Sequence, residues 1–259
     1  MNQDNQFGML AKYYDVLNYN ANYKKVADYI EEVFEIYKKK PQLVLDLACG
    51  TGSLTVELDK RGYDMTGLDL SPEMLSIAAA KASKKKKNKD YKNNILWINQ
   101  DMRFFELYGT VDAVVCCFDS VNYLRDEKDV KKCFAAVHNY LNPGGLFIFD
   151  VNSRYKFEFI YGKNNFVLEK KNVFCSWQNN YNKRDKTCEF YMTLFAKKPD
   201  GNYTRYDETQ KERYYGEGFL KESLLEIGFG DINIFWDFDC GEKNNIKKCG
   251  RVCFAAVKI

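Results

Sequence analysis

The sequence contains one histidine, His138, and its nine cysteines form no Cys-x-x-Cys pair, so the ligand spacings of common zinc sites are absent. Basic and acidic residues nearly balance, at 39 and 36, and the net charge of +3 does not by itself indicate a nucleic-acid partner. No run of 18 apolar residues occurs, and Met1 to Met9 lacks the apolar stretch of a signal peptide. We therefore expect a cytoplasmic protein without a metal site or a membrane span.

The composition is that of a chain that folds around a large core. Hydrophobic residues make up 46% of its 259 positions and aromatic residues 16%, which excludes a disordered or collagen-like chain. This length lies at the upper end for one α/β domain, so we expect one domain that carries an insertion. The odd number of cysteines, nine, is typical of reduced thiols that pack as small buried hydrophobes.

Helical and strand periodicities alternate through the first 151 residues. Apolar residues recur at three and four positions between Val26 and Phe34, as on one face of a helix, whereas 43–48 is almost wholly apolar, as in a strand buried on both sides. Ser71 before Pro72 is typical of a helix start. The alternation predicts an α/β fold with a doubly wound, mostly parallel sheet. The predicted strands are 43–48, 65–70, 95–98, 111–117 and 146–151, and the predicted helices are 23–38, one that ends near Arg61, one that begins after Ser71, and 126–141.

After residue 151 the pattern changes. Apolar and polar side chains alternate from Cys188 to Ala196, and the turn sequence 199–202 separates this run from a second one that ends near Tyr215. Such alternation around a turn predicts antiparallel hairpins. We expect a small β insertion over 152–215, with its hairpins in 166–215, and a core formed by 1–151 and 216–259. The last core elements are predicted as a helix over 218–227 and strands over 232–238 and 251–258.

A glycine-rich turn, Asp46-Leu47-Ala48-Cys49-Gly50-Thr51-Gly52, follows the first predicted strand. In a doubly wound sheet such a turn presents backbone N–H groups to a ligand at the carboxyl ends of the strands. Asp46 and Thr55 depart from the dinucleotide-binding pattern. Asp69 ends the second strand, where its carboxylate can accept ribose hydroxyls, and Asp101-Met102 follows the third. Acidic strand ends without a basic phosphate clamp suit a nucleoside with a cationic amino-acid tail, which is the composition of S-adenosylmethionine.

At these residues the chain resembles the class I S-adenosylmethionine-dependent methyltransferases, over essentially its whole length. The segments that carry the resemblance are 44–52 for the glycine-rich motif, 67–71 for the acidic ribose loop, 100–102 for the adenine loop and 141–145 for the turn before strand five. The resemblance implies a seven-stranded sheet whose final strand is antiparallel. It also implies that adenine lies near Asp101 and Met102, the ribose on Asp69 and the methionine tail over 50–52.

By the same resemblance, Tyr14-Asp15 folds over the cofactor, and 117–123 lines the face where the methyl group is transferred. S-adenosyl-L-homocysteine would be the product. The residues that we predict to bind the cofactor are Tyr14, Tyr23, Asp46, Ala48, Cys49, Gly50, Thr51, Gly52, Asp69, Leu70, Met74, Asp101, Met102 and Cys117.

Methyl transfer from a sulfonium is an in-line displacement that needs alignment and exclusion of water, and it requires no metal. Aromatic faces favour the cationic donor, and Tyr14, Phe118 and Tyr123 are candidates for that wall. A neutral amine attacks unaided, whereas a hydroxyl needs a base. We expect His138, near the C-terminal end of its helix, to face solvent or interact with the helix dipole rather than act as that base. The candidate proton acceptors are Tyr14, Asp119 and Tyr123. The lack of a histidine base and of a metal-site pattern favours nitrogen over oxygen as the methyl acceptor.

The insertion resembles, by its position, the lids of small-molecule members of the family, including amino-sugar N-methyltransferases. This likeness implies that it covers the pocket of a small-molecule acceptor. The candidate lining residues are Tyr155, Trp177, Arg213 and Tyr214, which also suit a sheet core or exposed cross-strand pairs.

Other functions compete with this interpretation. The lysines 81, 84–87, 89 and 92 would suit an RNA or tRNA base methyltransferase, although a solvated helix end explains them more simply. The Asn/Asp-Pro-Pro-aromatic motif of nucleic-acid amino methyltransferases is absent after the fourth strand, where Phe118-Asp119-Ser120-Val121 stands. A non-catalytic S-adenosylmethionine-binding protein is the second alternative, because a fold does not guarantee turnover. A nicotinamide dehydrogenase is the third.

Overall fold

Seven strands form the main sheet, in the order β10-β11-β5-β4-β1-β2-β3. Five of them are parallel neighbours, and β11 runs antiparallel to both β5 and β10, as the sequence resemblance implies. The computed structural model describes residues 10–85, 94–162, 164–170, 172–241 and 245–259. The N-terminal segment 1–9 and most of the lysine cluster, 86–93, lie outside the described residues. The strand bounds are Leu43–Leu47 (β1), Asp64–Asp69 (β2), Leu96–Asn99 (β3), Val111–Cys116 (β4), Leu141–Asn152 (β5), Phe229–Trp236 (β10) and Arg251–Lys258 (β11).

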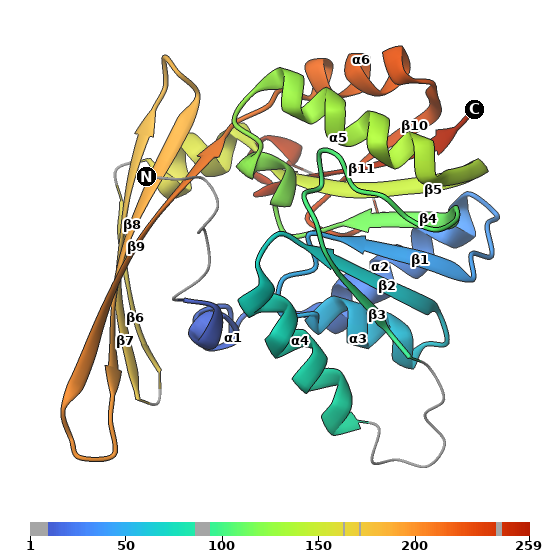
Figure 1. Cartoon of the computed structure of the whole chain (residues 1–259). Coiled ribbons are helices and arrows are strands. Elements are labelled where there is room, and N and C mark those ends of the chain that lie inside the picture. Colours follow the sequence, from blue (N-terminus) through green and yellow to red (C-terminus); the bar gives the residue numbers. More distant parts are fainter. Residues whose placement is uncertain (1–9, 86–93, 163, 171, 242–244) are drawn as a thin grey trace.

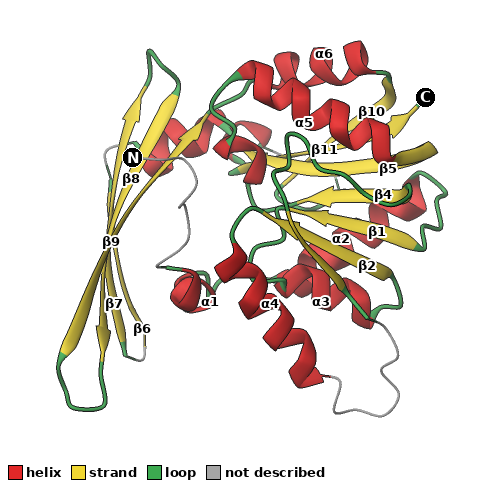
Figure 2. Cartoon of the chain, in the orientation of Figure 1, coloured by secondary structure: helices red, strands yellow, loops and turns green. Residues whose placement is uncertain are grey.

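Helices cover both faces of this sheet (Figure 2), which confirms the predicted doubly wound fold. Buried side chains of α2 (Tyr23–Ile36) and α3 (Ser53–Lys60) pack on one face, and those of α5 (Glu127–Tyr140) and α6 (Glu217–Ile227) pack on the other. A further helix, α4 (Pro72–Lys85), lies beside α3. The carboxyl ends of the parallel strands stay uncovered by these layers.

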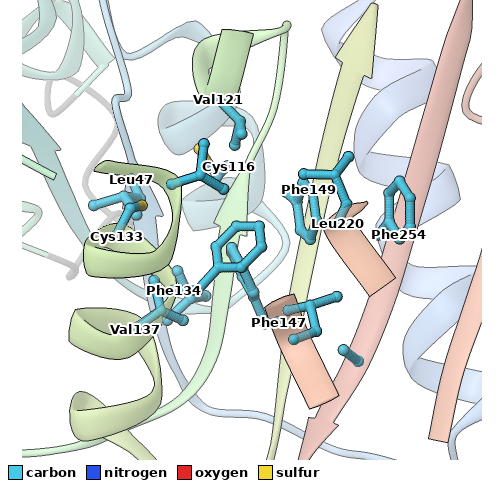
Figure 3. Packing of buried hydrophobic residues seen from close by; sticks show 14 of the residues in the cluster. Leu47, Cys116, Val121, Cys133, Phe134, Val137, Phe147, Phe149, Leu220 and Phe254 are labelled. Atoms are coloured by element: carbon cyan, nitrogen blue, oxygen red, sulfur yellow. The ribbon is translucent and has the colours of Figure 1, made fainter. Parts of the chain in front are cut away.

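The core on the α5 side contains a row of packed phenylalanine rings among aliphatic side chains (Figure 3). Phe134 of α5 contacts Phe147 and Phe149 of β5, with ring centroids 5.6 and 5.0 Å away. Phe149 in turn stacks on its cross-strand partner Phe254 of β11 at 5.0 Å. All four rings are fully buried. Because such closely packed interiors resist deformation, the sheet holds its strand ends in fixed positions.

A second sheet stands beyond the carboxyl ends of the main strands (Figure 1). Its antiparallel strands, in sequence order, are β6 (Asn165–Lys170), β7 (Val173–Asn182), β8 (Thr187–Lys197) and β9 (Tyr203–Arg213). The predicted antiparallel β structure is therefore confirmed, and its strands fall inside the predicted insertion. The exact domain boundaries at 152 and 215 stay a prediction.

Several element bounds differ from the predictions. β5 begins at Leu141, five residues early, because Leu141 still pairs with Val111 and the run 142–145 then bulges before pairing resumes between Leu146 and Ala113. β10 begins at Phe229 and contains a similar irregularity between Gly230 and Asn233. Such bulges insert unpaired residues that a two-residue alternation does not reveal.

The structure also bears on the sequence-based expectations about cysteine and membranes. All nine cysteines are free thiols, and seven of them are buried. Among the described residues, no helix is long and apolar enough to cross a membrane.

Candidate active site

The glycine-rich turn after β1 depends on two glycines with different roles. Gly50 has a φ of +54°, and the position of an added Cβ would have no atom within 4 Å, so space is open beside the backbone. Gly52 has a φ of +67°, and an added Cβ would lie 2.5 Å from the Trp97 ring and 2.7 Å from the Cβ of Ala78. Gly50 therefore lets a ligand approach the backbone, and Gly52 lets the turn pack against β3 and α4.

Asp46 at the end of β1 is buried and accepts a hydrogen bond of 2.5 Å from the hydroxyl of Thr55 in α3. Burial raises the pKa of Asp46 to about 7. Thr55 occupies the position where a dinucleotide-binding turn has a small residue, and here it supplies the donor that a buried carboxylate needs.

Asp69 at the end of β2 joins the turn to the start of α4. Its Oδ2 accepts a hydrogen bond from the backbone N–H of Gly50 (2.7 Å), and its Oδ1 accepts one from that of Ser71 (2.9 Å). Ser71 Oγ accepts from the N–H of Met74 at 3.2 Å, which confirms Ser71 as the N-cap of α4. Burial raises the pKa of Asp69. Each carboxylate oxygen still has lone-pair capacity for a ribose hydroxyl.

Asp101 follows β3 and is held by an arginine that the sequence analysis missed. The Arg103 guanidinium bonds Asp101 Oδ2 at 2.6 Å and Asp129 Oδ2 at 3.0 Å. Burial raises the pKa of Asp101, but the hydrogen bonds and charge of Arg103 outweigh it, and the net pKa is lowered. Because two carboxylates match its charge, Arg103 is not a phosphate clamp. The sequence Asp-x-Arg after a strand is the signal that could have revealed this pair.

A cavity of about 310 Å³ connects this edge of the main sheet to the inner face of the second sheet. Its volume lies at the lower end of small-molecule pockets. The predicted site residues that line it are Tyr14, Tyr23, Ala48, Gly50, Asp69, Leu70, Met74, Asp101, Met102, Asp119, Tyr123 and Trp177. A smaller cavity of about 40 Å³ is lined by the further predicted residues Asp46, Cys49, Thr51 and Cys117.

Three predicted acceptor-pocket residues do not line either of these two cavities. Tyr155 stacks on Phe159 at 5.4 Å, and Tyr214 packs against Phe157. Arg213 donates to the backbone oxygen of Arg125 at 3.0 Å. Gly52, predicted to bind the cofactor, also lies outside both cavity linings. The lining residues that the sequence analysis missed include Lys156, Tyr161, Cys175, Met192, Gln210, Glu212 and Arg251.

The error on β9 is one of strand parity. Successive side chains of a strand face opposite sides, so Gln210 and Glu212 face the cavity while Arg213 does not. The alternation between buried Gln210 and Glu212 and their partly exposed neighbours is the signal that separates the two faces.

Asp119 is held at the end of β4 by a buried ionic group. Phe118 and Asp119 both have positive φ, +63° and +60°, which is a strained conformation for residues with side chains. The carboxylate of the fully buried Asp150 accepts from both backbone N–H groups, at 2.6 and 3.0 Å. Arg251 pairs with Asp150 and with Asp119 Oδ1, the latter at 2.5 Å. This arrangement leaves Asp119 Oδ2 without a hydrogen-bond partner among the described residues.

Tyr123 connects the site to the second sheet and to the N-terminal segment. Its hydroxyl donates to Gln210 Oε1 (3.0 Å), and Gln210 donates to Glu208 (2.7 Å). Glu208 Oε2 accepts from the backbone N–H of Leu10 at 3.3 Å. Burial raises the pKa of both Tyr123 and Tyr14, so these phenols stay protonated at neutral pH. Neither is poised to act as a general base in this state.

The N-terminal helix α1 (Tyr14–Leu17) lies between the two sheets (Figure 1) and closes one side of the cavity. Asp15 accepts from the Thr51 hydroxyl at 2.6 Å and pairs with Lys81 of α4 at 2.8 Å. Lys81 belongs to the lysine cluster considered for nucleic-acid binding, but it is engaged in holding this helix. Burial raises the pKa of Tyr23, which lines both cavities, to about 12.

His138 lies outside the cavity lining and packs edge-on against Phe229 at 5.2 Å. Burial lowers its pKa, and its Nε2 has no hydrogen-bond partner among the described residues. His138 is only partly exposed, because the turn before β10 packs against its ring at Gly228, and an interaction with the helix dipole stays a prediction. It remains correct that His138 is not placed to be the base.

A sheet of this order, with a glycine-rich turn and acidic strand ends around one cavity, defines a class I methyltransferase. A family model described as a methyltransferase domain matches residues 44–145. A protein of Geobacillus sp. named as a methyltransferase is 32% identical over 88% of this chain and 90% of its own length. The solved structure of an S-adenosylmethionine-dependent methyltransferase from Clostridium acetobutylicum is 30% identical in sequence and superposes with a TM-score of 0.84. The match covers 97% of this chain and 98% of that protein's chain. The chain belongs to the S-adenosylmethionine-dependent methyltransferases.

Two more distant relatives match about half of the chain. A glycine/sarcosine N-methyltransferase of Halorhodospira halochloris is 31% identical over 55% of this chain and 51% of its own length. A dTDP-3-amino-3,4,6-trideoxy-alpha-D-glucopyranose N,N-dimethyltransferase of Streptomyces venezuelae is 29% identical over 53% and 55%. The predicted likeness to amino-sugar N-methyltransferases is thus confirmed at the level of family and layout.

The residues present fit S-adenosylmethionine. Gly50 leaves open space at the turn, Asp69 offers a half-buried acceptor to the ribose, and Asp101 and Met102 lie at the next strand end. When bound, this cofactor supplies an electrophilic methyl group on a sulfonium, which a nucleophile takes as the carbon–sulfur electron pair returns to sulfur. The residues around it align the partners and exclude water.

Proposed function

We propose that this protein methylates the nitrogen of a small-molecule amine. The observation that carries the proposal is the placement of a partly unsatisfied carboxylate, Asp119, in a cavity that aromatic side chains such as Tyr14, Tyr123 and Trp177 also line. Carboxylates and aromatic faces both attract ammonium groups. The names of the two N-methyltransferase relatives support nitrogen as the acceptor.

In this proposal the cofactor occupies the half of the cavity around Gly50, Asp69 and Asp101, and the acceptor occupies the half beneath the second sheet. Asp119 holds the acceptor amine through its Oδ2, while Arg251 and Asp150 act as positioning residues. Tyr14, Tyr123 and Trp177 form the wall that excludes water. The remaining predicted cofactor residues that line the two cavities keep their proposed role.

The test uses S-adenosylmethionine with a labelled methyl group and matched acceptors that differ only in the nucleophile. Glycine is compared with glycolate, glucosamine with glucose, and unfractionated tRNA is a third arm. We expect label in the amines alone, at a kcat/KM about 10- to 100-fold lower in Asp119→Asn, since a hydrogen bond to a charged group is lost.

The matched control is Asp207→Asn, because Asp207 lies on β9 but is exposed and pairs with Arg205 on the outer side. It should leave the rate unchanged. Methylation of glycolate, glucose or tRNA in place of the amines would overturn the proposal.

A further inference from the structure

Glu212 of β9 is a second carboxylate in the acceptor half of the cavity. Its side chain is buried, with 2% of the residue exposed, and it lines the cavity. Its Oε2 accepts a hydrogen bond of 2.7 Å from Asn152 Nδ2. In the part of the chain that the structure describes, Oε1 has no hydrogen-bond partner. This oxygen is therefore open to the cavity, where a ligand can supply a donor to it.

The side-chain amide of Asn152 links the Glu212 carboxylate to Lys156. Its Oδ1 accepts from Lys156 Nζ at 2.7 Å, and its backbone N–H donates to Asn122 Oδ1 at 2.8 Å. Lys156 lines the same cavity and lies over the Tyr161 ring at 5.2 Å. The amide thus lies between Glu212 and Lys156, which form no direct ion pair among the described residues.

We propose that Glu212 is the proton acceptor for an aliphatic amine that enters the cavity as an ammonium ion. This inference rests on the proposed N-methylation. An ammonium has several N–H donors, so it can contact Glu212 Oε1 and Asp119 Oδ2 together. In the step itself, one N–H bond breaks, its electron pair stays on nitrogen as the attacking lone pair, and the proton forms an O–H bond on Glu212. The proton stays on Glu212 when the product leaves and passes to solvent when the next ammonium ion binds.

The charges around Glu212 suit this role. Burial raises the pKa of Glu212, the charge of Asp119 raises it further, and the charges of Lys156 and Arg251 lower it. Burial also lowers the pKa of Lys156. The other titratable groups that face Glu212 are the phenols of Tyr123 and Tyr161 and the thiol of Cys188, and burial raises the pKa of each. These effects together raise the pKa of Glu212 well above its usual value, and a cation that enters the cavity beside Glu212 lowers that pKa.

Sinefungin tests the proposal without knowledge of the natural acceptor. This analogue carries an amine-bearing carbon in place of the methylsulfonium, so its ammonium group projects toward the acceptor half. Titration calorimetry compares sinefungin with S-adenosylhomocysteine in two buffers of different ionisation enthalpy. We expect wild-type protein to prefer sinefungin and to release protons as it binds, because the ammonium displaces a proton from Glu212.

Glu212→Gln should reduce the preference for sinefungin about 10- to 100-fold and abolish the proton release, with affinity for S-adenosylhomocysteine retained. Lys156→Met should shift the proton release to higher pH, because Glu212 loses a nearby cation; this variant keeps the test decisive if Glu212→Gln does not fold. Asp207→Asn is again the control. If Glu212→Gln keeps both the wild-type preference for sinefungin over S-adenosylhomocysteine and the wild-type proton release, the inference about Glu212 is overturned. The proposed function would not be affected by that result. No binding of S-adenosylhomocysteine to wild-type protein would instead contradict the cofactor site and the proposed function.

Discussion

Gly52→Ala should destabilise the protein well beyond Gly50→Ala, although both residues have nearly the same φ, +67° and +54°. An alanine at either position takes a left-handed conformation, which costs about 1–2 kcal/mol. Only at Gly52 does the new Cβ lie 2.5 Å from Trp97 and 2.7 Å from Ala78, and overpacking of this kind costs about 1–3 kcal/mol more. Effects on the unfolded chain are shared by the two variants and cancel in the comparison.

Urea unfolding of the ligand-free proteins measures the difference, which we expect to be about 1–3 kcal/mol in the free energy of unfolding. Trp97→Leu should recover part of the loss in the Gly52→Ala background, since a smaller side chain leaves room for the added Cβ. Equal stabilities of Gly52→Ala and Gly50→Ala would refute the assignment of Gly52 to close packing.

Three further predictions concern the acidic residues and their partners. Asp69→Ala should weaken S-adenosylmethionine binding by about 1.5–3 kcal/mol, as measured by calorimetry, because ribose loses a charged acceptor, and an unchanged Kd would refute that placement. The raised pKa of Asp46, about 7 against 3.8, means that the folded state binds its proton more tightly than the unfolded state. The free energy of unfolding of the wild-type protein should therefore fall by up to about 4 kcal/mol, relative to that of Asp46→Asn, as the pH rises from about 4 to about 7. Urea unfolding that gives the same pH dependence for both proteins would contradict this. Arg251→Met should lower the free energy of unfolding by about 3–5 kcal/mol, measured by thermal unfolding, because Asp150 stays buried without its cation. Lys132→Met, which removes an exposed ion pair, should lower it by less than about 1 kcal/mol. Equal losses in the two variants would contradict the role of the buried pair.

The main sheet and the cofactor edge could be predicted because their signals are local. Apolar runs of strand length, and a cap such as Ser71 before Pro72, are written within a few residues. The turn from Asp46 to Gly52 could also be predicted locally, since the residues of this one segment determine its backbone conformation.

The acceptor half could not be predicted to the same depth, because its residues come from segments far apart in the chain. Arg251 meets Asp119 across 132 positions of sequence, and no local pattern indicates that pairing. On β9 the prediction selected Arg213 instead of Glu212, because a strand's pattern shows that side chains alternate but not which face meets the cavity. The contact of His138 with the turn at Gly228 could not be predicted for a similar reason, since that turn lies about 90 positions later.

The bond between Leu10 and Glu208 also has a consequence for how the protein is made. These residues are 198 positions apart, so at ordinary rates of synthesis roughly 10 to 40 s pass between their emergence from the ribosome. Asp15 can meet Thr51 and Lys81 soon after synthesis, whereas Leu10 must wait for Glu208. Until β9 has emerged, the cavity of the nascent chain therefore lacks the wall that the second sheet supplies.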